Sequence, residues 1–294
     1  MRKIKQMMKK AAAAYKLARH ERTILPFSAH VPLWLNGGLC MSELWIGASA
    51  SFVCTSLGAL PALLLRNVSH RGKDILLAFT AGIMVAASTY GLIPSSLKLS
   101  NLWVLTAGIL AGTVLLLLIE LLLPHTDPVN SLEAQAGADD PEELRTRLDS
   151  GLLLFLTAMT IHNIPEGLSV GLSYASGPGQ LGHVVALAIG LQNIPDGFLI
   201  ALFLQAQGTG RLKAWVLAAL TGLLEMLAYL LGYQFSAQWE GIVPFGLAFA
   251  AGAMLFVVYK ELIPESHGDG NARMATFSFI LGLLCMIAIT ETLG

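Results

Sequence analysis

The chain has 294 residues, of which 55% are hydrophobic and only 13% are charged, whereas a soluble domain carries about a quarter charged residues. Together with a mean hydropathy of +0.66, this composition excludes an ordinary soluble protein and predicts an integral membrane protein in a lipid bilayer. The net charge of −1 and the lack of a basic face beyond the first turns exclude a nucleic-acid partner. Cys40, Cys54 and Cys285 are isolated and odd in number, which excludes a disulfide framework and a CxxC zinc site.

The first 43 residues form a basic N-terminal tail. Eight Lys and Arg side chains precede residue 23, and Pro26, Pro32 and Asn36 then interrupt the chain. A cleaved signal peptide is not predicted, because the apolar run is too interrupted and no small-residue cleavage site closes it. The composition favours a basic amphipathic helix that lies on the lipid headgroups.

Eight apolar segments are long enough to cross a bilayer, which takes about 20 residues per helix. The expected spans cover residues 44–65, 75–97, 102–123, 151–174, 182–204, 212–235, 241–263 and 274–292. The predicted fold is therefore an all-α polytopic membrane protein with eight transmembrane helices. Residues 44–123 hold helices 1–3, and residues 151–294 hold helices 4–8.

Positive charge in the short connections predicts the orientation, because Lys and Arg favour the cytoplasmic side. The connections after the first, fifth and seventh spans carry Arg66, Arg71, Lys73, Arg211, Lys213 and Arg273. Both termini are therefore expected to face outward, although the basic tail alone points the other way. The acidic connection of residues 124–150 is then a mobile cytoplasmic loop, in which His125 and Asp127 could catch a metal ion.

A six-residue motif occurs twice inside the apolar spans. The first copy is His162-Asn163-Ile164-Pro165-Glu166-Gly167, and the second is Gln192-Asn193-Ile194-Pro195-Asp196-Gly197. A charged side chain in the hydrocarbon region costs about 2.5 kcal/mol or more, so an ionisable residue there indicates function, usually an ion pathway.

The spacing of the motif places two polar side chains on one face of each helix. His162 and Glu166 are four residues apart, as are Gln192 and Asp196. At about 1.5 Å per residue, both copies lie near the middle of a hydrocarbon core about 30 Å thick, and Glu225 lies at a similar depth in the sixth span. Three carboxylates in one dry site cannot all stay ionised without a cation.

A divalent metal ion resolves this conflict. Imidazole with carboxylate suits zinc and other first-row metals, and amide oxygens from Asn163, Gln192 and Asn193 permit a looser shell than a structural site has. Pro165 and Pro195 each remove a backbone donor, which predicts kinked helices at the site. Three carboxylates leave the site with a negative net charge when one divalent ion is bound and with a positive net charge when two are bound. We therefore expect a second ion to weaken the binding of the first.

Residues 77–96 and 247–266 form a second internal repeat. Leu77-Ala78-Phe79-Thr80-Ala81-Gly82-Ile83-Met84 matches Leu247-Ala248-Phe249-Ala250-Ala251-Gly252-Ala253-Met254, and Leu92-Ile93-Pro94 matches Leu262-Ile263-Pro264. In the predicted orientation the two segments run in opposite directions. Such an inverted repeat is typical of transporters that bind their cargo at the membrane midplane. The position of Met84 in this repeat makes it a candidate ligand.

These motifs resemble the ZIP (Zrt/Irt-like) family of divalent metal transporters, in particular its bacterial GufA-like branch. The likeness covers roughly residues 44–294 and is strongest in the two motif copies and in Tyr259-Lys260-Glu261-Leu262-Ile263-Pro264-Glu265-Ser266-His267. The resemblance implies eight helices in a 3+2+3 inverted arrangement, a binuclear metal centre between the fourth and fifth helices, and alternating access. It implies zinc uptake into the cytoplasm across the inner (plasma) membrane, with no prosthetic group.

The resemblance also implies the metal ligands. The first metal position would use Met84, His162, Glu166, Gln192 and Asp196, and the second would use Asn163, Glu166, Asn193, Asp196 and Glu225. Glu261 would belong to the release path, with His125, Glu265 and His267 as lesser candidates. Relatives often carry His at the position of Gln192 and Glu at the position of Asp196. An acid in some relatives is replaced by Asn193 here, and a histidine is replaced by Lys260. Lys260 would either reach to water or pair with Glu261.

Two other functions stay open on the residues alone. An intramembrane metalloprotease would also place a metal-binding histidine and a glutamate on one helix, but the HExxH pattern is absent. A membrane metal sensor or storage protein would bind the ion without moving it. The ligand types do not rank zinc against cadmium, iron(II) or manganese(II). Gly108, Ala111 and Gly112 could allow close helix contact either within the fold or between the protomers of a homodimer.

Overall fold

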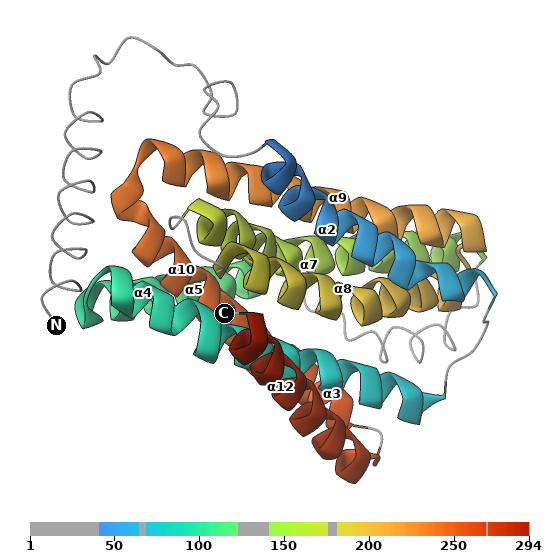
Figure 1. Ribbon diagram of the computed structural model, residues 1–294. Coiled ribbons are helices and arrows are strands. Elements are labelled where there is room, and N and C mark those ends of the chain that lie inside the picture. Colours follow the sequence, from blue (N-terminus) through green and yellow to red (C-terminus); the bar gives the residue numbers. More distant parts are fainter. Residues whose placement is uncertain (1–40, 65–68, 123–140, 176–180, 269, 294) are drawn as a thin grey trace, which may run out of the picture. The chain divides into compact units, whose positions relative to one another are not determined.

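Figure 1 shows the computed structural model, in which residues 41–64, 69–122, 141–175, 181–268 and 270–293 are described. All elements of these ranges are helical, in agreement with the all-α prediction. The predicted headgroup helix falls on residues 1–40, outside the described residues. The same holds for residues 124–140 of the acidic connection, including His125 and Asp127.

The described ranges form long helices with short breaks. In chain order the elements are α2 (Met41–Ala59), η2 (Leu60–Leu63), α3 (His70–Ala86), η3 (Ala87–Leu92), α4 (Ile93–Leu99), α5 (Leu102–Leu122), α7 (Pro141–Ala175), α8 (Leu181–Ala206), α9 (Arg211–Gln238), η4 (Glu240–Ile242), α10 (Val243–Val257), η5 (Val258–Leu262), α11 (Ile263–His267) and α12 (Ala272–Leu293). Helix α7 includes residues 141–150, which the sequence assigned to the acidic connection.

Seven helical segments within the described ranges are long and apolar enough to cross a membrane. They correspond to the first, second, third, fifth, sixth, seventh and eighth expected spans. Helix α7 contains the fourth expected span as one continuous helix. The chain is therefore a multi-pass membrane protein, and the count of eight crossings stays a prediction.

The inverted repeat is visible in how its two halves pack. Helix α4, at the end of the first half, contacts α10 at the start of the second, while α11, at the end of the second half, contacts α3. Ser96 Oγ of α4 donates a hydrogen bond to the Pro244 carbonyl of α10 at 2.7 Å. Because each half begins beside the other half's end, the two segments run antiparallel.

Both halves of the repeat also share a local irregularity. A π-helical turn, η3 or η5, comes immediately before the matching Ile-Pro pair. The Ile93 N–H donates to the Ser88 carbonyl, and the Ile263 N–H to the Val258 carbonyl, five residues back in each case. Pro94 and Pro264 have no N–H of their own, so the wider turn relieves the clash that proline makes with the preceding helical turn. By contrast, α7 and α8 continue as α-helix through Pro165 and Pro195.

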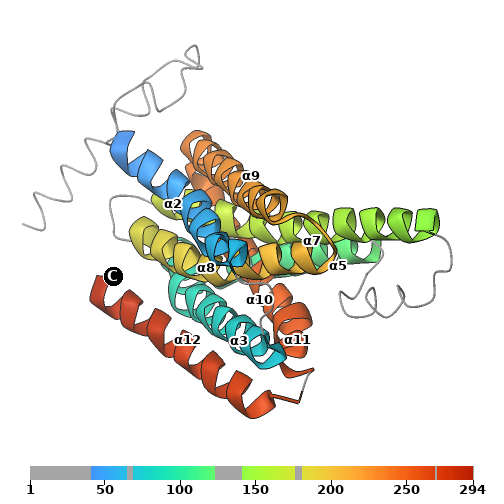
Figure 2. The same ribbon diagram turned by 90° about the vertical axis from the view of Figure 1, so that its right-hand side faces the viewer.

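Glycines set four close helix contacts that obey the same symmetry. A Cβ atom added at Gly82 would lie 2.1 Å from the Phe279 carbonyl oxygen. One added at Gly282 would lie 2.2 Å from the Phe79 carbonyl oxygen. These contacts join α3 to α12, which lie side by side in Figure 2. The corresponding contacts join α5 to α10: a Cβ at Gly252 would lie 2.3 Å from the Ile109 oxygen, and one at Gly112 would lie 2.2 Å from the Phe249 oxygen. Gly112 therefore serves contact within the fold.

The three short basic connections lie at the same end of the helices. Arg211 Nη1 donates to the Leu63 carbonyl at 3.0 Å, so the connections after the first and fifth spans meet. Asn271 Nδ2 donates to Asp74 Oδ2 at 2.9 Å, which brings the connection after the seventh span to the same end. This clustering agrees with the charge pattern from which the orientation is predicted.

A candidate metal site between three helices

Helices α7, α8 and α9 pack on one another and carry the polar residues that the sequence singles out. The two motif copies have the same pattern of burial: all residues are buried except the isoleucine at the third position. Ile164 and Ile194 are 40% and 43% exposed. Because the helices turn the same way at both copies, each presents its polar residues inward and one isoleucine outward.

All expected ligands of the two metal positions are buried. Their exposed fractions are Met84 1%, His162 7%, Asn163 4%, Glu166 0%, Gln192 0%, Asn193 2%, Asp196 8% and Glu225 0%. Four ionisable side chains, those of His162, Glu166, Asp196 and Glu225, lie close enough to interact electrostatically. The fold thus gathers side chains from three separate spans at one place.

The His162 imidazole stands between two carboxylates. Its Nε2 atom lies 3.7 Å from Glu166 Oε1 on the same helix, as the spacing of four residues predicts. Its Nδ1 atom lies 3.7 Å from Glu261 Oε2 of η5. The expected release-path residue is therefore beside the expected first ligand.

The residues expected for the second metal position meet across helices. Asn193 Nδ2 of α8 donates a hydrogen bond to Glu225 Oε2 of α9 at 2.7 Å. Ser51 of α2 lies beside Glu225, and Thr80 of α3 lies beside Asp196. The sequence analysis missed Ser51 and Thr80, because a small hydroxyl residue in an apolar helix carries no signal of its own. Met84 lies one turn after Thr80 on α3 and is equally buried.

Several buried oxygen and nitrogen atoms at this place have no hydrogen-bond partner in the described part of the chain. They include both carboxylate oxygens of Glu166, Oε1 of Glu225, Nδ1 of His162 and both side-chain amide atoms of Gln192. A buried carboxylate without a partner is costly, and a bound cation would satisfy these atoms. Within the described ranges, no three His, Cys, Asp or Glu side chains converge as a ready-made metal cage. The donor set fits a divalent ion.

The residues at the end of the seventh span take separate roles. Lys260 Nζ lies 3.0 Å from Glu120 Oε1 of α5, so Glu120 is an ion-pair partner of Lys260. As the only charged residue of the third expected span, Glu120 could have been found by the same intramembrane-charge argument.

His267 is held within the fold: Nδ1 lies 3.0 Å from the Ile263 carbonyl and Nε2 lies 3.3 Å from Thr276 Oγ1. Glu265 is exposed.

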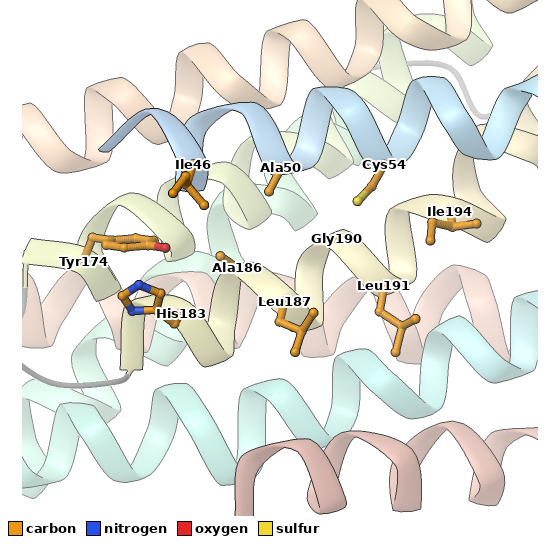
Figure 3. Close-up of a pocket in the computed structure, with 10 residues that line it drawn as sticks. All are labelled: Ile46, Ala50, Cys54, Tyr174, His183, Ala186, Leu187, Gly190, Leu191 and Ile194. Atoms are coloured by element: carbon orange, nitrogen blue, oxygen red, sulfur yellow. The ribbon is translucent and has the colours of Figure 1, made fainter. Parts of the chain in front are cut away.

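A pocket with a volume of about 280 Å³ lies between α2 and α8 and contains none of the expected ligands. Figure 3 shows Ala50 and Cys54 on the α2 wall, across from Gly190 of α8. Its lining is almost wholly apolar. The candidate metal site and this pocket are therefore separate features.

Comparison with known proteins gives a consistent likeness. Residues 124–290, which include α7, α8 and α9, match the family described as ZIP Zinc transporter. The chain is 36% identical over 249 residues to zinc transporter GufA of Myxococcus xanthus, which covers 82% of this chain and 94% of that protein. It is 34% identical over 265 residues to zinc transporter ZIPB of Bordetella bronchiseptica, which covers 85% and 81%. It is 27% identical over 341 residues to zinc transporter ZIP11 of Homo sapiens, which covers 88% and 100%.

Proposed function

Because the chain belongs to the ZIP family of zinc transporters, we propose that it carries Zn²⁺ across the inner (plasma) membrane into the cytoplasm. A member of this transporter family moves divalent metal ions and is not an enzyme, so the metalloprotease alternative is set aside. The ion would bind between α7, α8 and α9. That two copies of the chain form a homodimer stays an expectation from the sequence.

The observation that carries this proposal is the group of three buried carboxylates from three helices, those of Glu166, Asp196 and Glu225. Both oxygens of Glu166 and Oε1 of Glu225 have no hydrogen-bond partner in the described part of the chain. Apolar residues could fill the same volume at lower cost. Charged residues in this position therefore support a path for a cation.

The chemistry of the ligands supports reversible binding. The first metal position would use His162, Glu166, Gln192 and Asp196 with Met84, and the second would use Asn163 and Asn193 with Glu225, while Glu166 and Asp196 bridge the two. Neutral amide and thioether ligands add little charge and hold the ion less firmly than thiolates would. The ion can therefore leave the site when the helices move.

The release step would use the contact between His162 and Glu261. These two side chains are 3.7 Å apart at their nearest ionisable atoms, and Glu261 is 40% exposed while His162 is almost fully buried. This contact supports a role for Glu261 in passing the ion from a buried ligand toward water. Alternating access would then consist of movement of α7 and α8 relative to the helix that carries Glu261.

Time-resolved zinc uptake into proteoliposomes tests the proposed function. We expect saturable uptake by the unmodified protein, competition by cadmium, and loss of uptake in Glu166→Ala. Glu291→Ala, which changes an exposed glutamate of α12, is the matched control and should transport normally. Zinc binding by correctly inserted protein without uptake would contradict transport and favour a sensor or storage protein.

A further inference from the structure

Two neighbouring residues of η5 connect three helices. Lys260 Nζ lies 3.0 Å from Glu120 Oε1 at the end of α5, and Glu261 Oε2 lies 3.7 Å from His162 Nδ1 of α7. Successive side chains of a helix point in different directions, so the two residues reach different neighbours. A single π-helical turn therefore joins an ion pair at the edge of the protein to the candidate metal site.

The Lys260–Glu120 pair lies near the end of α5 and is partly exposed. The Glu120 side chain is 19% exposed and sits in the last turns of an otherwise apolar helix, while the Lys260 side chain is 49% exposed. Lys260 is the cationic partner of this carboxylate. The Lys260–Glu120 pair thus connects η5 to α5.

The inverted repeat has no equivalent of this arrangement in its first half. The residues that correspond to Lys260 and Glu261 are Tyr90 and Gly91 in η3. Gly91 has no side chain that could reach a neighbouring helix. The charged arrangement therefore exists at one end of the fold only, although the π-helical turn exists in both halves.

We propose that Lys260 and Glu120 are positioning residues that hold the Glu261 carboxylate against His162. This inference rests on the proposed function, because Glu261 matters only if the ion passes His162. The ion pair anchors η5 to α5 on one side, and the anchored turn then directs Glu261 into the edge of the metal site on the other. Lys260 itself does not contact the ion.

A double-mutant cycle on zinc affinity of the purified full-length protein tests this proposal. We expect Lys260→Met and Glu120→Gln each to weaken zinc binding about tenfold, the low end of what loss of an orienting partner costs a metal site. In a Glu261→Gln background, Lys260→Met should have no further effect. The exchange of both charges, Lys260→Glu with Glu120→Lys, should restore most of the affinity. Lys213→Met, an exposed lysine of α9, is the matched control.

The cycle separates positioning from a merely structural role. If Lys260→Met weakened zinc binding equally with and without Glu261, or if the exchanged pair failed to restore it, the proposal would be wrong.

A second measurement does not depend on zinc. With cysteines at positions 162 and 261, a short bifunctional thiol reagent should cross-link the two helices several-fold more slowly after Lys260→Met. Unchanged cross-linking would overturn the proposal. If the cross-linking depended on Lys260 but the unmodified protein did not bind zinc, only the proposed function would be refuted.

Discussion

Glu166 has an unusual environment. It is fully buried, and neither carboxylate oxygen has a hydrogen-bond partner in the described part of the chain. Glu225 differs, because Asn193 satisfies one of its two oxygens. A single ion would therefore be attracted first to the neighbourhood of Glu166, and Glu225 would complete a second, weaker position.

Replacement of Glu225 tests this difference between the two positions. We expect zinc titration of the unmodified protein to show two binding events and that of Glu225→Gln to show one, with the first event little changed. Loss of a hydrogen bond or contact to a charged group costs about 1.5–3 kcal/mol, so the second event should weaken about tenfold or more. Leu224→Ala, an exposed neighbour on α9, is the control. A single event in the unmodified protein would contradict the two-position arrangement.

Acidification should weaken zinc binding, because the ion must displace protons from His162 and from the shared carboxylates. The sign follows directly: lower pH favours the protonated ligands, which cannot coordinate zinc. We expect the affinity to fall as the pH drops from neutral to about 6, where histidine ordinarily takes up a proton. Isothermal titration at several pH values checks this. A flat affinity would show that unprotonated His162 is not a main ligand.

Much of the candidate site could be predicted from residue spacing. His162 with Glu166, and Gln192 with Asp196, are related within one helix, and a helical period is enough to place them together. The contacts of Lys260 with Glu120 and of Asn193 with Glu225 join different helices. Their partners depend on how each helix is rotated against its neighbours, which no local pattern records.

The elements are held together by close backbone contacts at glycines. At Gly82 and Gly252 an added methyl group would lie 2.1 and 2.3 Å from a carbonyl oxygen of the neighbouring helix. Backbone cannot move aside as a flexible side chain can. The sequence repeat showed that these two positions correspond, but it did not show that the partner helices obey the same symmetry. The π-helical turns were also not predicted, because proline alone does not say how a helix adapts to it.

Alanine substitutions at these glycines provide a test at the level of helix packing. We expect Gly82→Ala and Gly252→Ala to destabilise the protein by about 1–3 kcal/mol, as overpacking of a close contact does. Gly91→Ala should be tolerated, because its added Cβ would meet only a Val185 methyl carbon at 4.0 Å. Thermal unfolding in detergent measures the difference. Equal stability of all three variants would contradict the close contacts.

At the scale of the whole molecule, the contacts place the basic connections at one end of the helices. This end is expected to face the cytoplasm. Helices α5 and α12, which occupy corresponding places in the inverted arrangement, are each only 22% buried across their apolar windows. They therefore form the outer faces of the described fold, where lipid or a second protomer would contact it.

Thiol labelling from the two sides of the membrane tests the orientation. In a variant that lacks Cys40, Cys54 and Cys285, a cysteine at Arg71 should react only with reagent that reaches the cytoplasm. A cysteine at Lys98, near the opposite end of the same span, should react with membrane-impermeant reagent added outside. The reverse pattern would invert the topology and turn the proposed uptake into export.

The pairing of α3 with α12 has a consequence for how the protein is made. Gly82 is synthesised well before the backbone that packs on it, which belongs to α12. During translation, the small-residue face of α3 therefore stays without its partner helix until α12 has been inserted. A nascent chain released before α12 would keep that face uncovered, and the quality-control machinery of the cell would meet a fold that is unfinished near its beginning.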